Sequence, residues 1–497
     1  NIKWGNSLIG SDFFRGPQAS LFADEEAMLK VKAFDWDSDA GFGDIMAAGG
    51  FDAVIGNPPY VRQEILGKDF KDYAKKKYET YHGVADLYTY FIEQAHRILK
   101  SKGVFAMICS NKFMRARYGT ALRNYLSKKV KIREIVDFGE LPVFESASTF
   151  PAIIITSRQL PAEQRFLYAA IKRLDFSTLL EEVKLQGSIL DSRSIANNNW
   201  TLARSEEIEI MEKMQKIGLP LDSYVGGSIH YGIKTGRNDA FVIDEYVRQS
   251  LIEQDIKSEE IIKPFLIGRD VYGYKDLQLK RYVIFTRRGT DIEKYQAIKA
   301  YLQQFRTLLE PKPKGWKGTW QGRKPGTYKW YEIQDTVDYH YEFTKPKIIY
   351  PVIAKEPRFT IDTKGFYSND KTFIIPNANL YLLGLLNSKL AWLYLKRTCS
   401  VLGDPDKRGR LELRDIYVRT LPIRTIDFDN PEDVKMHDEM VALVDDMLDR
   451  HKQLPGLMGE GRKIAEALIQ RVDNEIDALV YRLYGLSEDE VAVVEGR

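Results

Sequence analysis

The stretch Phe51-Asp52-Ala53-Val54-Ile55-Gly56-Asn57-Pro58-Pro59-Tyr60 carries the clearest structural signal in the chain. Its first part is a short apolar run that is β-branched in the middle, and Gly56 and two prolines follow. This pattern predicts a buried strand that ends in a rigid turn. Ligands of open α/β sheets bind at the carboxyl ends of the strands. We therefore expect Asn57, Pro58, Pro59 and Tyr60 to line a binding crevice.

The turn offers the groups that chemistry on an exocyclic amine requires. The lone pair of such a nitrogen is delocalised into its ring, so the nitrogen is a poor nucleophile. The side-chain oxygen of Asn57 and the backbone oxygen of Pro58 can both accept hydrogen bonds from one NH2 group, which returns electron density to nitrogen. Proline fixes φ and so holds these acceptors in place, while Tyr60 offers a stacking face. A plain Pro-Pro turn after a strand is the alternative interpretation.

Composition sets wider bounds on the protein. With 497 residues and 44% hydrophobic content, the chain is long enough for about three domains or subdomains. The net charge of +3 conceals basic residues concentrated in the middle third and acidic residues after Pro431, which suggests a local surface for a polyanion. Cys109 and Cys399 are far apart, so we expect a reducing cytoplasm rather than a disulfide framework. The six histidines are scattered, so no metal site is expected, and no apolar run of about 18 residues indicates a membrane span.

The residues after Tyr60 alternate between strand and helix patterns. Residues 68–77 predict a surface helix or a mobile loop, and an amphipathic helix begins at Asp86. Strands are predicted at residues 104–109, 131–138 and 152–155, with a helix at residues 116–126. This alternation is typical of a doubly wound α/β sheet.

Several motifs together resemble one family. Asn57-Pro58-Pro59-Tyr60 is similar to the catalytic motif of S-adenosylmethionine-dependent amino-methyltransferases. Leu386-Asn387-Ser388-Lys389, Leu421-Pro422-Ile423 and the segment 479–486 resemble the specificity domain and the end of single-chain type II, type IIG-like, restriction-modification methyltransferases. The resemblance covers nearly the whole chain. It implies an α/β fold in which a partial Rossmann-like methyltransferase sheet precedes an α+β target-recognition domain and a C-terminal helical hairpin. We expect the methyltransferase sheet at residues 1–160, a bridge at 161–225, the target-recognition domain at 226–425 and the helical hairpin at 426–497.

The resemblance also implies roles for residues near the turn. Asn57 to Tyr60 would be catalytic, and Phe144 of Leu141-Pro142-Val143-Phe144 would hold the extruded base together with Tyr60. Core packing is the other interpretation of Phe144. Asn6, Ser7 and Leu8 lie about fifty residues ahead of the turn and resemble the segment that binds the cofactor, S-adenosylmethionine, although an ordinary Asx-turn would give the same letters.

The densest basic segment spans residues 312–331. It carries six basic residues, no acidic residue, and tryptophans and tyrosines between them. Basic side chains supply salt-dependent phosphate affinity, and aromatic rings can stack on bases. We therefore expect double-stranded DNA as the partner. The candidate contacts are Lys314, Trp316, Lys317, Trp320, Arg323 and Lys324, with Lys234, Thr235, Arg237 and Arg269 from two further Gly-containing basic loops.

The C-terminal segment predicts two long helices, at residues 432–450 and 462–484, which should pack as an antiparallel hairpin. The second helix has an apolar stripe at a helical spacing, formed by Ile464, Leu468, Val472, Ile476, Leu479 and Leu483.

Two expected parts of such an enzyme are missing from the sequence. The family's Gly-rich cofactor loop and its acidic partner should precede Gly5, and no convincing endonuclease site is present. The chain also begins at Asn1 rather than methionine. We therefore expect an upstream region of the same gene product to supply both parts, an incomplete cofactor pocket, an open apolar edge on the strand before Asn57, and no endonuclease activity from this chain alone.

These observations predict a site-specific DNA methyltransferase that acts on N6 of adenine. N4-cytosine methylation presents the same geometry and stays open. Enzymes that methylate protein glutamines or ribosomal RNA share the motif, but they do not need the long basic module that follows it here. A DNA-binding specificity protein with an inactive catalytic half is the fourth interpretation.

Overall fold

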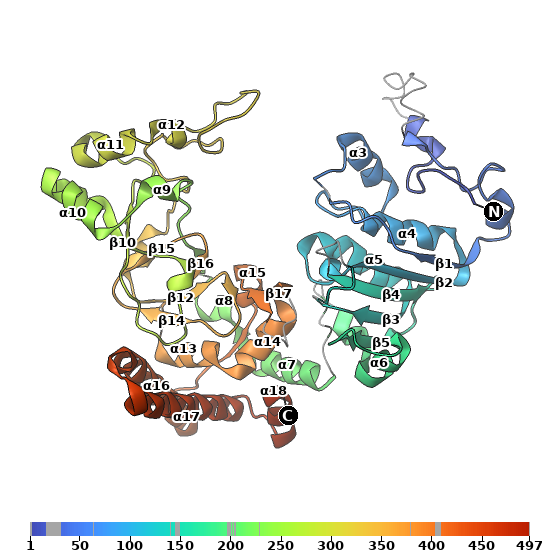
Figure 1. Cartoon of the computed structure of the whole chain (residues 1–497). Coiled ribbons are helices and arrows are strands. Elements are labelled where there is room, and N and C mark those ends of the chain that lie inside the picture. The colour runs from blue at the N-terminus through green and yellow to red at the C-terminus, as the bar shows by residue number, and fades with distance from the viewer. Residues whose placement is uncertain are drawn as a thin grey trace. The chain divides into compact units, whose positions relative to one another are not determined.

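The computed structural model describes residues 2–15, 31–62, 64–139, 141–144, 150–195, 200, 202, 205–227, 229–377, 379–402 and 409–496. The chain divides into two compact units, Asn1–Ile208 (unit 1) and Glu209–Arg497 (unit 2), shown in Figure 1. Helix α7, Ser205–Ile217, contains the point at which unit 1 gives way to unit 2. Within the described ranges, every helix is too short or too polar to cross a bilayer.

The described part of unit 1 is organised on a six-stranded sheet with the order β1-β2-β4-β3-β5-β6. Its strands are β1 Phe51–Gly56, β2 Leu99–Ser110, β3 Lys131–Asp137, β4 Pro151–Ser157, β5 Arg165–Ala170 and β6 Gly187–Asp191. β1 is parallel to β2 and β3 is parallel to β5, whereas β4 is antiparallel to both β2 and β3. The carboxyl ends of β1, β2, β3 and β5 therefore share one edge. The predicted α/β class and its strands are confirmed.

Helices accompany this sheet, as the alternating pattern predicts. They are α2 Gly43–Ala47, α3 Lys68–Lys77, α4 Tyr88–Ile98, α5 Thr120–Lys129 and α6 Leu179–Gln186. The apolar face of α4 buries Ile92 and Ala95 in a cluster with Phe105 of β2. Residues 68–77 form a helix rather than a loop, and Asp69 in its first turn and three lysines in its last turn complement the helix dipole.

The expected bridge at residues 161–225 is wrong for its first half. β5 pairs with β3, and β6 pairs with β5, so the sheet continues to Asp191 and the boundary at residue 160 falls inside it. These strands were not predicted because β5 pairs with a strand that is distant in sequence. In addition, turns interrupt the apolar pattern in this part of the sequence.

β1 lies at an outer edge of this sheet within the described residues. The side chain of Ile55 is 85% exposed, and an ion pair joins Asp52 to Lys100 of β2. An edge strand leaves backbone groups unpaired and can pair with a further strand. Among the described residues, this edge is open and carries an exposed apolar side chain, as the sequence led us to expect.

The described part of unit 2 contains several small sheets. Two four-stranded sheets have the orders β15-β10-β11-β9 and β14-β12-β16-β8, and β13-β18-β17 and β19-β7 complete the set. The strands are β7 Gly218–Pro220, β8 His230–Tyr231, β9 Val242–Ile243, β10 Ile262–Leu266, β11 Tyr282–Ile284, β12 Lys347–Pro351, β13 Ile353–Ala354, β14 Thr360–Asp362, β15 Tyr367–Ser368, β16 Thr372–Pro376, β17 Ser400–Leu402, β18 Arg410–Glu412 and β19 Pro422–Arg424.

Helices surround these sheets and end in a long hairpin. They are α8 Leu221–Tyr224, α9 Asn238–Phe241, α10 Glu245–Gln254, α11 Gln296–Gln303, α12 Arg306–Leu309, α13 Leu380–Asn387, α14 Lys389–Thr398, α15 Asp415–Val418, α16 Pro431–Gln453, α17 Gly459–Leu483 and α18 Glu488–Glu495. The break between α13 and α14 comes from Asn387, whose side chain donates to Phe359 O (2.9 Å), and from Ser388, whose side chain caps α14.

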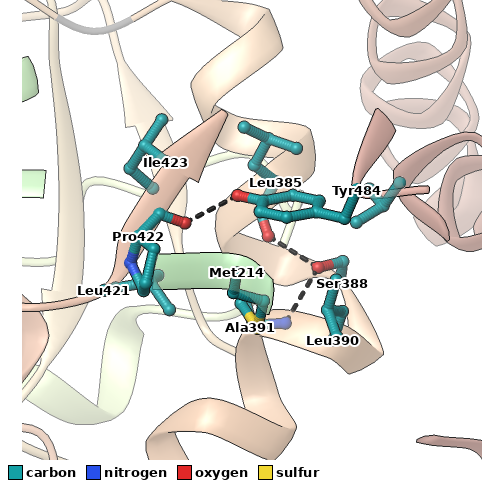
Figure 2. Close-up of a pocket in the computed structure, with 10 residues that line it drawn as sticks. Met214, Leu385, Ser388, Leu390, Ala391, Leu421, Pro422, Ile423 and Tyr484 are labelled. Carbon is teal, nitrogen blue, oxygen red and sulfur yellow. Dashed lines mark hydrogen bonds between the residues drawn. The ribbon is translucent and has the colours of Figure 1, made fainter. Parts of the chain in front are cut away.

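The hairpin of α16 and α17 confirms the predicted C-terminal element (Figure 1). Its apolar stripe is buried at Val472, Ile476, Leu479 and Leu483, but Ile464 is 57% exposed, and Leu468 is exposed as well. The spacing of apolar residues predicts which face of a helix is apolar. It does not predict how much of that face another element covers. Figure 2 shows where β19 meets the hairpin, with the Tyr484 hydroxyl donating to Pro422 O at 2.6 Å.

A buried ion pair joins two strands of unit 2. Lys347 of β12 and Asp362 of β14 are directly opposite each other, and both side chains are 0% exposed. The Lys347 ammonium also donates to Phe343 O, and the Asp362 carboxylate accepts the backbone N–H groups of Lys364 and Phe366, both at 2.8 Å. Each charge is thus hydrogen-bonded as well as paired.

We predict that Lys347→Ala destabilises unit 2 by about 3–5 kcal/mol, because it leaves the Asp362 carboxylate buried and unpaired. Urea unfolding measures the loss. Lys355→Ala is the control, since Lys355 is exposed and its removal should change stability by less than about 0.5 kcal/mol. Equal effects of the two substitutions would contradict the buried pair.

Candidate functional site

The turn Asn57 to Tyr60 leaves the sheet at its carboxyl edge. β1 ends at Gly56, which lies opposite Met107 of β2. Asn57 is exposed, Pro58 is buried and Tyr60 is half-buried. The chain is then fixed again by two backbone bonds, Val61 N to Pro59 O at 2.9 Å and Leu87 N to Val61 O at 3.1 Å. The turn is therefore held at both ends while the Asn57 side chain faces solvent.

The structure brings Tyr60 and Phe144 together, although they are 84 positions apart in sequence. Their ring centroids are 5.9 Å apart with an interplanar angle of 61°. The Tyr60 hydroxyl is buried and has no hydrogen-bond partner among the described residues. Burial, and then the nearby Cys109 thiol, raise the pKa of Tyr60 to about 12. Tyr60 therefore remains a neutral phenol at physiological pH.

Two polar residues at the neighbouring strand ends were not singled out from the sequence. Asn111, directly after β2, donates from Nδ2 to Asp137 Oδ1 of β3 at 2.8 Å, and the same carboxylate oxygen accepts Gly139 N at 3.0 Å. Asn111 N also donates to Phe150 O at 2.7 Å. These bonds fix the start of the loop that leads to Phe144. A polar residue at or near the end of each of these predicted strands was the available signal.

The segment Asn6-Ser7-Leu8 forms a compact turn. Leu8 N donates to Asn6 Oδ1 at 3.2 Å, so Asn6 makes the Asx-turn that was the alternative interpretation. Ser7 O accepts Trp36 Nε1 at 3.1 Å, and Leu8 O accepts the Tyr78 hydroxyl at 2.7 Å. Leu8 is buried. Asn6 and Ser7 are half-exposed. A cofactor role for the segment would therefore have to use groups of these two residues other than Asn6 Oδ1 and Ser7 O.

The basic segment 312–331 presents most of its predicted contacts to solvent. Lys314, Lys317 and Lys324 are exposed, and Trp316 is 50% exposed. The rings of Trp316 and Trp320 meet edge to face with centroids 5.3 Å apart. Their indole nitrogens donate to Thr319 O and Glu310 O, each at 3.2 Å. The segment thus displays three ammonium groups beside a braced aromatic pair.

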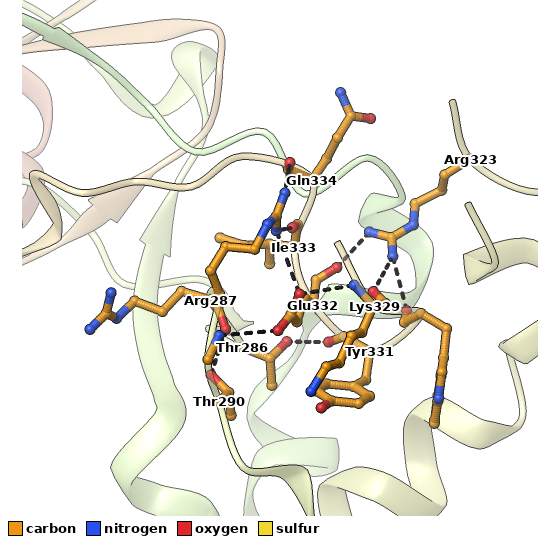
Figure 3. A network of polar contacts seen from close by, with 12 residues as sticks. Thr286, Arg287, Thr290, Arg323, Lys329, Tyr331, Glu332, Ile333 and Gln334 are labelled. Atoms are coloured by element: carbon orange, nitrogen blue, oxygen red, sulfur yellow. Dashed lines mark hydrogen bonds and ion pairs between the residues drawn. The ribbon is translucent and has the colours of Figure 1, made fainter. Parts of the chain in front are cut away.

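Arg323 differs from the expectation and is not available to DNA. Its side chain lies inside unit 2, with only 4% of the residue exposed, and burial lowers its pKa to about 10. The guanidinium donates to five backbone carbonyls, as Figure 3 shows in part: Leu309 O (2.7 Å), Glu332 O (2.7 Å), Trp330 O (2.9 Å), Thr235 O (3.1 Å) and Lys329 O (3.2 Å). Charge in a sequence does not reveal burial, so this scaffold role was missed.

Arg323 also ties together two segments that the sequence suggested separately. Its contact with Thr235 O joins the loop 234–237 to the segment 312–331, and Gln334 N adds a bond to the same carbonyl at 3.1 Å. Thr235 itself is buried, and its hydroxyl donates to Asn238 Oδ1 at 2.7 Å. Thr235 is therefore also corrected from a DNA contact to a structural residue. Lys234 and Arg237 stay half-exposed, and Arg269 is exposed.

Comparison with known families agrees with this division. Residues 7–144 match the Eco57I restriction-modification methylase family, and residues 263–423 match the TaqI-like C-terminal specificity domain. The first match lies within unit 1 and contains Asn57, Tyr60 and Phe144. The second lies within unit 2 and contains the basic segment 312–331.

Individual relatives are similar over most of the chain. The type II restriction enzyme and methyltransferase RM.Eco57I of Escherichia coli is 25% identical over 541 residues, covering 100% of this chain and 51% of that protein. The type II methyltransferase M.PaeR7I of Pseudomonas aeruginosa is 25% identical over 475 residues, covering 91% and 74%. This chain therefore spans about half the length of the first relative. The type IIL restriction-modification enzyme MmeI, solved in complex with DNA, shares the fold with a TM-score of 0.54 at 15% identity, covering 88% of this chain and 55% of that chain.

Proposed function

We propose, from the premise that the chain belongs with the type II DNA methyltransferases of restriction-modification systems, that it methylates N6 of adenine in a specific sequence of double-stranded DNA. The methyl donor would be S-adenosylmethionine, and the enzyme would act on DNA in the cytoplasm. The observation that carries the proposal is the exposed Asn57 amide at the carboxyl end of β1, beside the paired rings of Tyr60 and Phe144.

The target-base half of such a site can be assigned to named groups. An adenine inside a duplex is inaccessible, so it must be extruded, which costs a few kcal/mol of unstacking. Tyr60 and Phe144 would offset part of that cost by contact with the base. Asn57 Oδ1 and Pro58 O would accept the two N–H bonds of the amino group and return electron density to nitrogen. The Asn111–Asp137 hydrogen bond would position the loop that carries Phe144.

The described residues do not by themselves complete the cofactor half. The Asn6 side chain is used in its own turn, Leu8 is buried, and the outer edge of β1 is open. We propose that a further segment, with the Gly-rich loop and the endonuclease region upstream in the same gene product, pairs with β1 and completes the pocket. S-adenosylmethionine would then supply the methyl group.

Unit 2 would supply the affinity for DNA. Lys314, Lys317 and Lys324 would contact phosphates, and the Trp316–Trp320 pair would contact sugar or base. Lys234, Arg237 and Arg269 are the remaining candidates for contact, whereas Arg323 and Thr235 would act only as a scaffold. Phosphate contacts position the protein on DNA, and base contacts supply the specificity.

N4-cytosine methylation is the second candidate, because the NH2 of cytosine presents the same two N–H bonds to Asn57 and Pro58. Methylation of protein glutamine or ribosomal RNA and an inactive specificity protein are weaker candidates, since the relatives reported above are named type II methyltransferases, one of them also a restriction enzyme. Mapping the modified bases in DNA from cells that express the full gene separates the adenine and cytosine candidates, and unmodified DNA would leave only the two weaker ones. Methyl groups on cytosine N4 would overturn the adenine assignment.

We predict that Asn57→Ala lowers methyl transfer by at least about 100-fold, a loss typical of removing one preorganised polar group at a reacting centre, while DNA affinity stays largely intact. Incorporation of labelled methyl groups and filter binding measure the two effects in the form of the protein that binds S-adenosylmethionine. Asn124→Ala is the matched control, because Asn124 is exposed on α5. Transfer retained within about tenfold would refute the polarising role.

We predict that replacing Lys314, Lys317 and Lys324 by alanine weakens binding to all DNA sequences. The slope of log affinity against log salt should become shallower by about 0.9 for each lysine–phosphate ion pair that the substitutions remove. Replacing Trp316 or Trp320 should weaken binding with little change in that slope. Lys435→Ala on α16 is the exposed control. Unchanged affinity in both sets would show that the segment 312–331 does not touch DNA.

We predict that the 497-residue chain shows no saturable binding of S-adenosylmethionine at micromolar concentrations, because the β1 edge is not covered by the described residues. Isothermal titration measures this directly. A longer product of the same gene, joined in cis or added as a separate chain, should bind. Micromolar binding by the 497-residue chain alone would show that it already holds a complete pocket.

A further inference from the structure

Most arginines of residues 229–377 are already engaged within the structure. Arg248, Arg281, Arg306 and Arg358 pair with carboxylates, and Arg288 and Arg323 donate to backbone carbonyls. Among the described residues, the side chains of Arg237, Arg269 and Arg287 have no hydrogen bond or ion pair. The first two were candidates from the sequence. Arg287 was not, because nothing in the local sequence sets it apart from Arg288.

The backbone around Arg287 is fixed on both sides. Before it, Thr286 O accepts Ile333 N at 2.8 Å, and the Thr286 hydroxyl donates to Tyr331 O. After it, Arg287 O accepts both the N–H and the hydroxyl of Thr290, at 3.1 and 2.8 Å. Gly289 adopts a φ of +83°, which permits the tight turn. The Arg287 side chain therefore projects from a rigid turn just after β11.

The neighbouring Arg288 locks this turn to the basic segment. Its guanidinium donates to Ile333 O and to Gln334 O, the latter at 2.7 Å. The buried Glu332 carboxylate accepts Gly289 N at 3.1 Å and Lys329 N at 2.9 Å. Figure 3 shows the Arg287 side chain pointing away from this network. The two adjacent arginines therefore differ. Arg288 is hydrogen-bonded within the network, whereas the Arg287 side chain projects from the turn that this network holds in place.

The surroundings leave the Arg287 guanidinium available. It is half-exposed and lies near His340, whose pKa is lowered by burial and then by the Arg287 charge. His340 is therefore mostly neutral at physiological pH and does not repel Arg287. Among the described residues, no carboxylate lies within ion-pair distance of Arg287, so no internal partner has to be displaced before the guanidinium binds a ligand.

We propose that Arg287 is a specificity-determining residue that reads a guanine in the recognition sequence. The inference rests on the proposed function, in which unit 2 binds DNA. The planar guanidinium matches the O6 and N7 acceptors of guanine in the major groove, and this bidentate pair is the commonest specific contact between proteins and DNA. Such a pair demands a fixed direction, which the turn supplies. A phosphate contact needs only charge, which the exposed lysines of residues 312–331 provide.

The test is selection of binding sequences from a random duplex library by the full 497-residue chain, which needs no methyl transfer. The wild-type chain should enrich a sequence that contains guanine. Arg287→Ala should accept any base at one guanine position, keep the rest of the sequence, and bind the original sequence about 5- to 150-fold more weakly. Arg287→Lys keeps the charge but removes the planar pair of N–H donors, so this variant should also accept any base at that guanine position. Both variants should melt like the wild type, because the side chain has no internal partner among the described residues.

Lys324→Ala is the matched control, since it should weaken binding to every sequence and leave the enriched sequence unchanged. The inference is overturned if Arg287→Ala enriches the wild-type sequence. It is also overturned if that variant only lowers the salt slope by about one and Arg287→Lys restores it, because Arg287 would then contact a phosphate. A wild-type chain that enriches no sequence would contradict the proposed function itself, which is a separate and recognisable outcome.

Discussion

Parallel hydrogen bonding between β1 and β2 is the constraint on which the candidate active site depends. The pairing runs from Phe51 opposite Leu99 to Gly56 opposite Met107, so both strands end at the same edge of the sheet. Antiparallel β4, placed between β2 and β3, brings the end of β3 to that edge as well. Asn57, Asn111 and Asp137 therefore converge although they are distant in sequence. The two prolines after Asn57 then limit how far the turn can relax, so the direction of the Asn57 amide follows from the sheet rather than from contacts of its own side chain.

Unit 2 depends on a different device, the burial of one guanidinium among backbone carbonyls. Arg323 satisfies carbonyls from Leu309, Thr235 and the segment 329–332, and so fixes three segments that no regular secondary structure joins. A lysine could not replace it, because an ammonium has three donors on a point charge, whereas the guanidinium has five in a planar fork. Burying a charge costs several kcal/mol unless its donors are satisfied, and here each nitrogen has at least one acceptor. Buried Arg323 therefore holds in place the segment 312–331, which carries the lysines and tryptophans proposed to contact DNA.

The sequence predicted the features that local patterns determine. The turn at Asn57, the strand pattern around it and the C-terminal hairpin follow from apolar period and from Gly and Pro positions, and the structure has them. Features that depend on distant partners were missed. β6 pairs with β5, which joins the sheet through β3. Arg323 is buried by segments up to 88 positions away, and α13 and α14 are separated where Asn387 bonds to Phe359. The sequence does not distinguish Arg287 from Arg288. Their roles differ because backbone carbonyls of the described residues accept hydrogen bonds from the Arg288 side chain and not from that of Arg287.

The two units differ in how complete their described parts are. The frame around Arg288, Glu332 and Arg323 is held by hydrogen bonds that lie within unit 2, so the loops it carries are fixed without help from another segment. β1, in contrast, has one side paired with β2 and an outer edge where Ile55 is 85% exposed. A strand added at that edge would pair the free backbone groups of β1 and bury Ile55 in the same step. It would also lie directly beside the turn at Asn57. Under the proposed function, recognition of DNA and completion of the methyl-transfer site are therefore separable properties, and β1 is the element through which the second is gained.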